Sequence, residues 1–266
     1  MKPIKLTMQI LSIEELEIEC SLSDGKENIP ITYLLASDHA VISTNSFLAE
    51  IIRNLQLQVV KVIKSAIKGN LVAGQTINCV FIEGFNFLKE SDYQKYIRID
   101  RRKEGLDITT SETKMKDIHK IYADGSYADE TKQSGYSGFI ENPDGTQQIF
   151  HRSFINGNSN LMELLAVLDG LQRLQSVEKI QVNTDSRFVI RGLVQWVHFW
   201  KFNNWQTAYG REVKFAKYWQ QIEPLCEGKL IEFKWIKGHS GNEKQDFCHQ
   251  MAGECARNSD GDFTTI

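Results

Sequence analysis

Three acidic residues that lie far apart in the sequence fall at places where secondary structure could bring them together. Asp124 lies in the tail of a predicted strand (KIYADGSYA, 120–128), Glu163 one turn into a leucine-striped helix (160–175), and Asp185 at the end of the strand-like run KIQVNTD. In an α/β layer fold, strand ends and the first turn of a covering helix meet at one sheet edge. Carboxylates gathered there repel one another unless a cation neutralises them, and oxygen ligands suit Mg²⁺ or Mn²⁺.

Each acid also has a purely structural interpretation. Asp124 precedes a glycine, a pair typical of turns, and Glu163 stands three residues after Asn160, where a capping-box acid would be. Asp185 could cap the helix that follows it. For any one of the three this interpretation is favoured, but together they favour a metal site.

The surrounding sequence predicts the elements that would position these acids. Alternating segments joined by turn residues predict a three-stranded meander, followed by the leucine helix, a buried strand, helical residues, and a last strand and helix. The predicted ranges are 120–128, 135–142, 146–154, 160–175, 179–186, 186–225, 230–238 and 242–257.

The first half of the chain shows a different pattern of predicted elements. Strand-like runs at 4–11, 16–22, 29–36 and 76–82 surround a predicted helix over 44–70, which Thr44 or Asn45 could cap and Gly69 could end. We expect a small α+β domain over 1–102 and a polar linker over 103–117. Nothing in this half indicates catalysis, and its partner, protein or nucleic acid, is not predicted.

Composition sets broad limits. The 266 residues are 41% hydrophobic with a net charge of −3, so contact with nucleic acid must come from a local patch. The number of cysteines is odd, and they show no C-x-x-C spacing. The sequence also has no signal peptide and no apolar run of about 18 residues. These features favour a cytoplasmic protein with no membrane contact.

Four ordered blocks resemble type 1 ribonuclease H: YADGS, NSNLMELLA, NTDSRFVIRGLVQW and KWIKGHSGNEKQDFCHQMA. The resemblance covers about 117–257, and 195–220 looks like the extra helix and loop of the bacterial type. It implies a mixed five-stranded sheet with helices on both faces, as a catalytic domain over 118–258 with a tail over 259–266. It also implies hydrolysis of the RNA strand of RNA–DNA hybrids with two divalent metals.

The resemblance also assigns roles. Asp124, Glu163 and Asp185 take the first three metal-ligand positions, and His239, in a glycine-flanked loop, assists proton transfer or product release. Asn160 matches the second asparagine of a family pair, and Ser159 replaces the first. Arg187 stands where the family commonly has glutamine. The residues expected to contact substrate are Ser126, Ser159, Asn160, Arg187, Trp196, Lys201 and Lys214.

The fourth ligand, an aspartate in the family, falls on His249, with Asp246 three residues earlier as the alternative. At about 100° per residue, His249 lies roughly 110° from the centre of the apolar helix stripe and Asp246 roughly 170° from it. His249 can therefore reach a site at the sheet edge, while Asp246 points to water. We favour His249. The stripe consists of Cys248, Met251, Ala252 and Cys255.

Two other functions stay open at this point. The domain could be a non-catalytic hybrid-binding module of the same fold, or a nuclease of that fold that acts on another nucleic acid. Retention of Asp124, Glu163, Asp185 and His239 favours the enzyme, because binding alone requires none of them.

An imidazole ligand predicts an altered metal preference. Because a neutral imidazole is a softer donor than a carboxylate, the protein should favour Mn²⁺ over Mg²⁺ more than an all-carboxylate relative does. His249→Asp should shift this preference toward Mg²⁺ in cleavage rates measured with both ions. An equal metal preference in the two proteins would exclude His249 from the ligand set.

Overall fold

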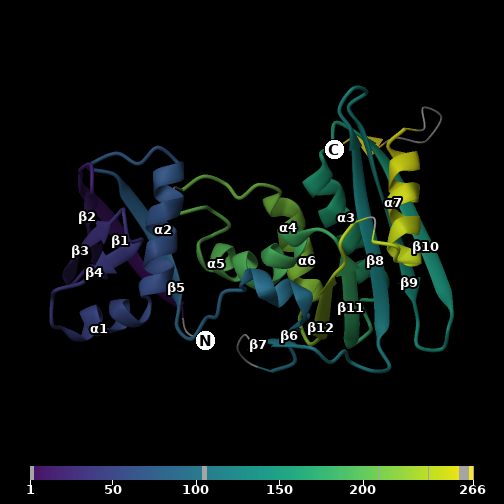
Figure 1. Cartoon of the computed structure of the whole chain (residues 1–266), viewed down its shortest axis with the longest axis horizontal. Coiled ribbons are helices and arrows are strands. Elements are labelled where there is room, and N and C mark those ends of the chain that lie inside the picture. Colours follow the sequence, from purple (N-terminus) through teal and green to yellow (C-terminus); the bar gives the residue numbers. More distant parts are fainter. Residues whose placement is uncertain (1–2, 104–106, 209, 239, 258–263, 266) are drawn as a thin grey trace. The chain divides into compact units, whose positions relative to one another are not determined.

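The computed structural model describes residues 3–103, 107–208, 210–238, 240–257 and 264–265. The chain forms two compact units (Figure 1). Unit 1 comprises Met1–Phe85 with His198–Lys214, and unit 2 comprises Asn86–Val197 with Phe215–Ile266. None of the helices in the described parts of the chain is long and apolar enough to cross a bilayer.

Unit 1 is built on an antiparallel five-stranded sheet with the order β4-β3-β2-β1-β5. Its strands are β1 (Pro3–Ile13), β2 (Glu17–Ser23), β3 (Asn28–Leu34), β4 (His39–Val41) and β5 (Thr76–Ile82). Two helices, α1 (Phe47–Asn54) and α2 (Gln56–Lys68), follow β4 in sequence. The sheet and helices confirm the small α+β domain expected from the sequence.

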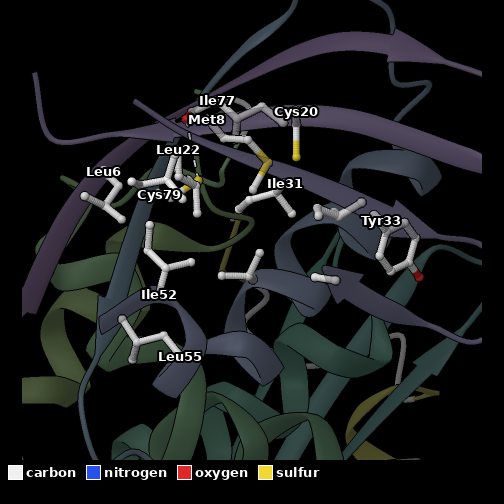
Figure 2. Close-up of a cluster of buried hydrophobic side chains, with 14 of the residues drawn as sticks. Leu6, Met8, Cys20, Leu22, Ile31, Tyr33, Ile52, Leu55, Ile77 and Cys79 are labelled. Atoms are coloured by element: carbon white, nitrogen blue, oxygen red, sulfur yellow. Dashed lines mark hydrogen bonds between the residues drawn. The ribbon is translucent and has the colours of Figure 1, made fainter. Parts of the chain in front are cut away.

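The core of unit 1 follows from the alternation in its strands. Leu6, Met8 and Ile10 are buried while the residues between them are exposed, so one face of the sheet is apolar. Figure 2 shows Leu6 and Met8 gathered with Ile52 and Leu55 of the helical segment, and Ile10 belongs to the same buried cluster.

The helix expected over 44–70 differs in detail. It is two helices that meet at Leu55, and its N-cap is Ser46, whose hydroxyl accepts from the Ala49 amide, so neither Thr44 nor Asn45 caps it. Gly69 is the C-cap, as expected.

Residues 198–214, a segment expected in the catalytic domain, group with unit 1. The rings of Phe85 and Phe199 pack edge to face with centroids 4.9 Å apart, and Ala208 packs against the unit 1 core. The segment includes most of α5 (Val197–Phe202).

Unit 2 contains the expected mixed five-stranded sheet, in the order β10-β9-β8-β11-β12. β8, β9 and β10 form an antiparallel meander, and β11 pairs in parallel with both β8 and β12. The strands are β8 (His119–Ala128), β9 (Gln133–Glu141), β10 (Gln147–Ile155), β11 (Lys179–Thr184) and β12 (Leu230–Trp235).

The sheet also extends past both edges of this set. β13 (Thr264–Thr265) pairs with β10, and β6 (Tyr96–Asp100) and β7 (Asp107–Ser111) extend the sheet beyond β12. Part of the segment 103–117, expected as a linker, is therefore a sheet strand. Its polar composition hid this role, because β7 is an edge strand and buries little.

Helices cover both faces of the unit 2 sheet, as expected. Ile121 of β8 lies under Gly170 of α3 (Ser159–Arg173), where an added Cβ would be only 2.7 Å from the isoleucine side chain. The next residue, Tyr122, packs with Cys248 of α7 (Glu243–Cys255). Because successive strand residues point to opposite faces, α3 and α7 cover opposite sides. The remaining elements are η1 (Glu90–Gln94), α4 (Arg187–Arg191), the π-helical turn η2 (Gly192–Trp196) and α6 (Ala216–Leu225).

A buried carboxylate ties β6 to the sheet. Glu232 of β12 has no exposed surface and accepts hydrogen bonds from Arg98 Nε and Gln181 Nε2, both at 2.6 Å, and from the Met115 amide at 3.2 Å. Buried charges require partners of this kind, so Arg98 is part of the structure of unit 2.

Arg98→Ala should therefore lower the free energy of unfolding of unit 2 by about 3 kcal/mol, because it leaves a buried carboxylate without its cation. The matched control is Arg102→Ala, which removes a more exposed pair with Asp100 and Glu178 and should cost about 1 kcal/mol or less. Urea denaturation of both variants checks this. Equal losses would show that the Glu232 cluster does not secure β6.

Candidate metal and active site

The register of the parallel pair β8–β11 brings two of the three acids together. Asn183 lies opposite Tyr122, and Asp185 and Asp124 each follow two residues later in their own segments. Both acids therefore come to the same edge of the sheet. Asp124 is 2% exposed, whereas Asp185 is half-buried.

Glu163 reaches this edge from α3. Gly125 lies directly against the helix, where an added Cβ would be 2.3 Å from the Glu163 backbone nitrogen. Only glycine permits this approach, and it brings the first turns of α3 against β8 beside Asp124. Glu163 itself is 9% exposed.

The three carboxylates form one cluster. Each offers an oxygen, and these atoms lie within 4.8 Å of one another. Burial, followed by the negative charges of Asp124 and Asp185, raises the pKa of Glu163 well above its usual value. Its Oε2 atom is buried with no hydrogen-bond partner among the described residues. An orphaned buried oxygen beside two further carboxylates fits a divalent cation.

None of the three acids has the turn, capping-box or N-cap role that a purely structural interpretation would give it. Asp124 lies within β8 and not in a turn. The N-cap of α3 is Asn158, which accepts from the Leu161 amide, so Glu163 is outside the capping box. The N-cap of α4 is Ser186 and not Asp185.

His249 lies beside the cluster. Its Nδ1 is 2.8 Å from Asp124 Oδ2, and its side chain is 51% exposed while that of Asp124 is 3% exposed. α7 is fixed there by buried Gln245, whose Nε2 donates to the Ala123 carbonyl at 3.1 Å. Asp246 is half-buried and does not belong to the acidic cluster. The role of His249 as a ligand stays a prediction.

Two contacts around Asp185 had no clear signal in the sequence. The indole Nε1 of Trp235 donates to the Asp185 carbonyl at 2.9 Å, and an added Cβ at Gly238 would lie 2.9 Å from Asp185 Oδ2. Both residues belong to the KWIKG run, where the tryptophan is equally compatible with a core position.

The other expected site residues are distributed over both units. Ser159 and Asn160 are exposed in the first turn of α3, and Ser126 is half-buried in β8. Trp196 is half-buried in unit 2, whereas Lys201 and Lys214 are exposed in unit 1. His239 lies outside the described residues.

Arg187 has partners that the sequence did not predict. Its guanidinium carbon lies 4.3 Å from the Trp235 ring centroid and 5.0 Å from that of Tyr93. Arg187 also forms an ion pair with Glu90 of η1. Residues of η1, which precede the segment 117–257, thus lie next to an expected substrate-binding residue.

Comparisons with known proteins agree with this geometry. Residues 116–257 match the family model described as RNase H. A ribonuclease H from Aliivibrio salmonicida is 32% identical over 150 residues, which cover 56% of this chain and 94% of that protein. One from Idiomarina loihiensis is 34% identical over 141 residues, which cover 53% of this chain and 88% of that protein.

Glu163→Gln should stabilise the metal-free protein. Without a cation, the folded protein keeps the Glu163 proton to higher pH than the unfolded chain does. Wild-type stability therefore falls as pH rises from about 4.5 through the raised pKa. In chelator at neutral pH the variant should melt a few degrees higher, because it removes a buried charge that Asp124 and Asp185 repel; each kcal/mol gained corresponds to about 2–4 °C.

At pH 4 the two proteins should melt at nearly the same temperature, and added Mn²⁺ should stabilise wild type more than the variant. Calorimetry across pH, with and without the ion, tests both points. Glu254→Gln, an exposed change on α7, is the control. A destabilised variant at neutral pH would contradict the unfavourable burial and repulsion of the Glu163 charge.

Proposed function

This chain belongs to the ribonuclease H family, and from that membership we propose that residues 118–258 form a metal-dependent endoribonuclease that hydrolyses the RNA strand of RNA–DNA hybrids. The observation that carries the proposal is the acidic cluster of Asp124, Glu163 and Asp185, in which one Glu163 oxygen has no hydrogen-bond partner within the described part of the chain. Such a cluster is costly to fold unless a cation occupies it.

The residues that would hold the metal are these three carboxylates and His249, and we propose two Mg²⁺ or Mn²⁺ ions. When bound, divalent ions supply an activated water and stabilise the charge of the departing oxygen. Asp124 is central to this arrangement because it neighbours both Glu163 and His249.

The separation between His249 and Asp124 supports a shared ion. His249 Nδ1 lies 2.8 Å from Asp124 Oδ2, so these two side chains would be able to hold one divalent ion together.

Choice of RNA requires groups that contact the 2′-hydroxyl near the cut. Asn160 is exposed and precedes Glu163 by three residues in α3, so both lie on the same helix face. We propose that Ser159 and Asn160 contact the RNA strand beside the metal ligands, with Ser126 and Arg187 as further contacts from unit 2. Trp196, Lys201 and Lys214 are proposed contacts to the DNA strand.

Asp124→Asn tests the enzyme directly. Loss of a shared ligand should reduce cleavage of a labelled RNA–DNA hybrid by more than about 100-fold, the upper end of the effect of removing a ligand's supporting partner. The assay uses Mg²⁺ and Mn²⁺ separately, with Glu254→Gln as the control.

Parallel assays on duplex RNA and single strands define the substrate. Hybrid binding without cleavage in wild type would indicate a non-catalytic module. Preferred cleavage of another substrate would indicate a different nuclease of this fold. Activity that survives Asp124→Asn would refute the proposed site.

A further inference from the structure

Two arginines on α4 share one carboxylate from η1. Glu90 forms an ion pair with Arg187, and its second oxygen lies 3.6 Å from Arg191 Nη2. Glu90 is 65% exposed, and the arginine side chains are 36% and 39% exposed. Part of each arginine side chain therefore faces solvent.

Aromatic side chains hold these guanidinium groups in place. Tyr93 is 1% exposed, and its ring centroid lies 5.0 Å from Arg187 and 5.4 Å from Arg191. Its hydroxyl accepts from Arg191 Nε at 2.7 Å. Trp235 contacts Arg187 as well. Arginines stacked on rings lose less freedom when they bind an anion.

Arg187 retains an unused donor. Its Nε is buried and has no hydrogen-bond partner among the described residues, although a guanidinium edge is a strong donor to oxyanions. The group is also adjacent to the metal ligands, because Trp235 contacts Arg187 on its ring face and donates to the Asp185 carbonyl.

We propose that Arg187 and Arg191 form a binding site for a backbone phosphate of the nucleic-acid strand next to the acidic cluster, and that Glu90 competes with that phosphate in the free protein. Tyr93 and Trp235 act as positioning residues. The inference rests on the proposed function, but η1 lies outside the family match at 116–257.

Competition follows from the strength of the contacts. Exposed ion pairs are weak because water and salt screen them, so the Glu90 contacts can be exchanged. A phosphate offers several charged oxygens to the two guanidinium groups and can engage them more fully than one carboxylate does.

Glu90→Gln should therefore tighten binding of an RNA–DNA hybrid by about two- to fivefold at about 0.1 M salt, a range that corresponds to one exposed ion pair. Binding is measured by fluorescence anisotropy on the full chain in chelator, so cleavage does not interfere. The matched control is Glu178→Gln. Glu178 is 60% exposed and pairs with Arg102, and it lies just before β11, at the end of that strand away from Asp185.

Arg187→Gln and Arg191→Gln should each weaken binding and make the dependence of log affinity on log salt shallower by about 0.7–0.9, the contribution of one phosphate contact. In the Arg187→Gln background the gain from Glu90→Gln should shrink. Inorganic phosphate at millimolar concentration should displace less hybrid from wild type than from Glu90→Gln if Glu90 occupies the phosphate position.

Equal affinities for Glu90→Gln and Glu178→Gln, or unchanged salt slopes in both arginine variants, would overturn the proposal. A wild type that cleaves hybrid while Glu90→Gln has no effect refutes this inference alone. A wild type that binds hybrid with these shifts but does not cleave it refutes the enzyme and retains the phosphate site. Absence of any hybrid binding refutes both.

Discussion

Mutual repulsion among Asp124, Glu163 and Asp185 is the constraint to which the rest of unit 2 responds. Three carboxylates whose oxygens lie within 4.8 Å of one another oppose folding in the absence of a cation. The fold holds them through elements that cannot easily separate: parallel pairing of β8 with β11, and the close approach of α3 to β8 at Gly125. Burial, and then repulsion by Asp124 and Asp185, raises the pKa of Glu163. The cluster lowers the stability of the metal-free protein, and binding of a cation at this edge would restore that stability.

The acids themselves were predictable because each lies where local patterns are easiest to read. The strand before Asp185 and the leucine stripe around Glu163 have clear periodicity, and their meeting follows from general rules of α/β packing. Less predictable were features that depend on distant partners. The polar segment around β7 becomes a strand only because β6 covers the edge of β12 and then pairs with β7. The Ser46 cap is a local contact, and it was missed because Thr44 and Asn45 are also good capping residues.

Residues that precede the family match thus contribute to the structure of the matched domain. The edge of β12 would otherwise expose unpaired backbone groups, which β6 covers with antiparallel hydrogen bonds. Glu232 then requires Arg98, so the added hairpin is joined to the sheet by charge as well as by backbone pairing. The same addition carries η1, which brings Tyr93 and Glu90 to the arginines of α4. None of these pairings could be read from the spacing of the residues alone.

The charge of the proposed site connects these features. With a neutral imidazole at position 249, the ligand set carries one negative charge fewer than four carboxylates would. Bound divalent ions would therefore leave more positive charge facing the substrate, and Arg187 and Arg191 add to it. A positively charged edge favours phosphate but also binds other anions. The Glu90 carboxylate partly neutralises this charge in the free protein. Because its ion pairs with the two arginines are exposed and therefore weak, a nucleic-acid strand that places a phosphate there can displace it.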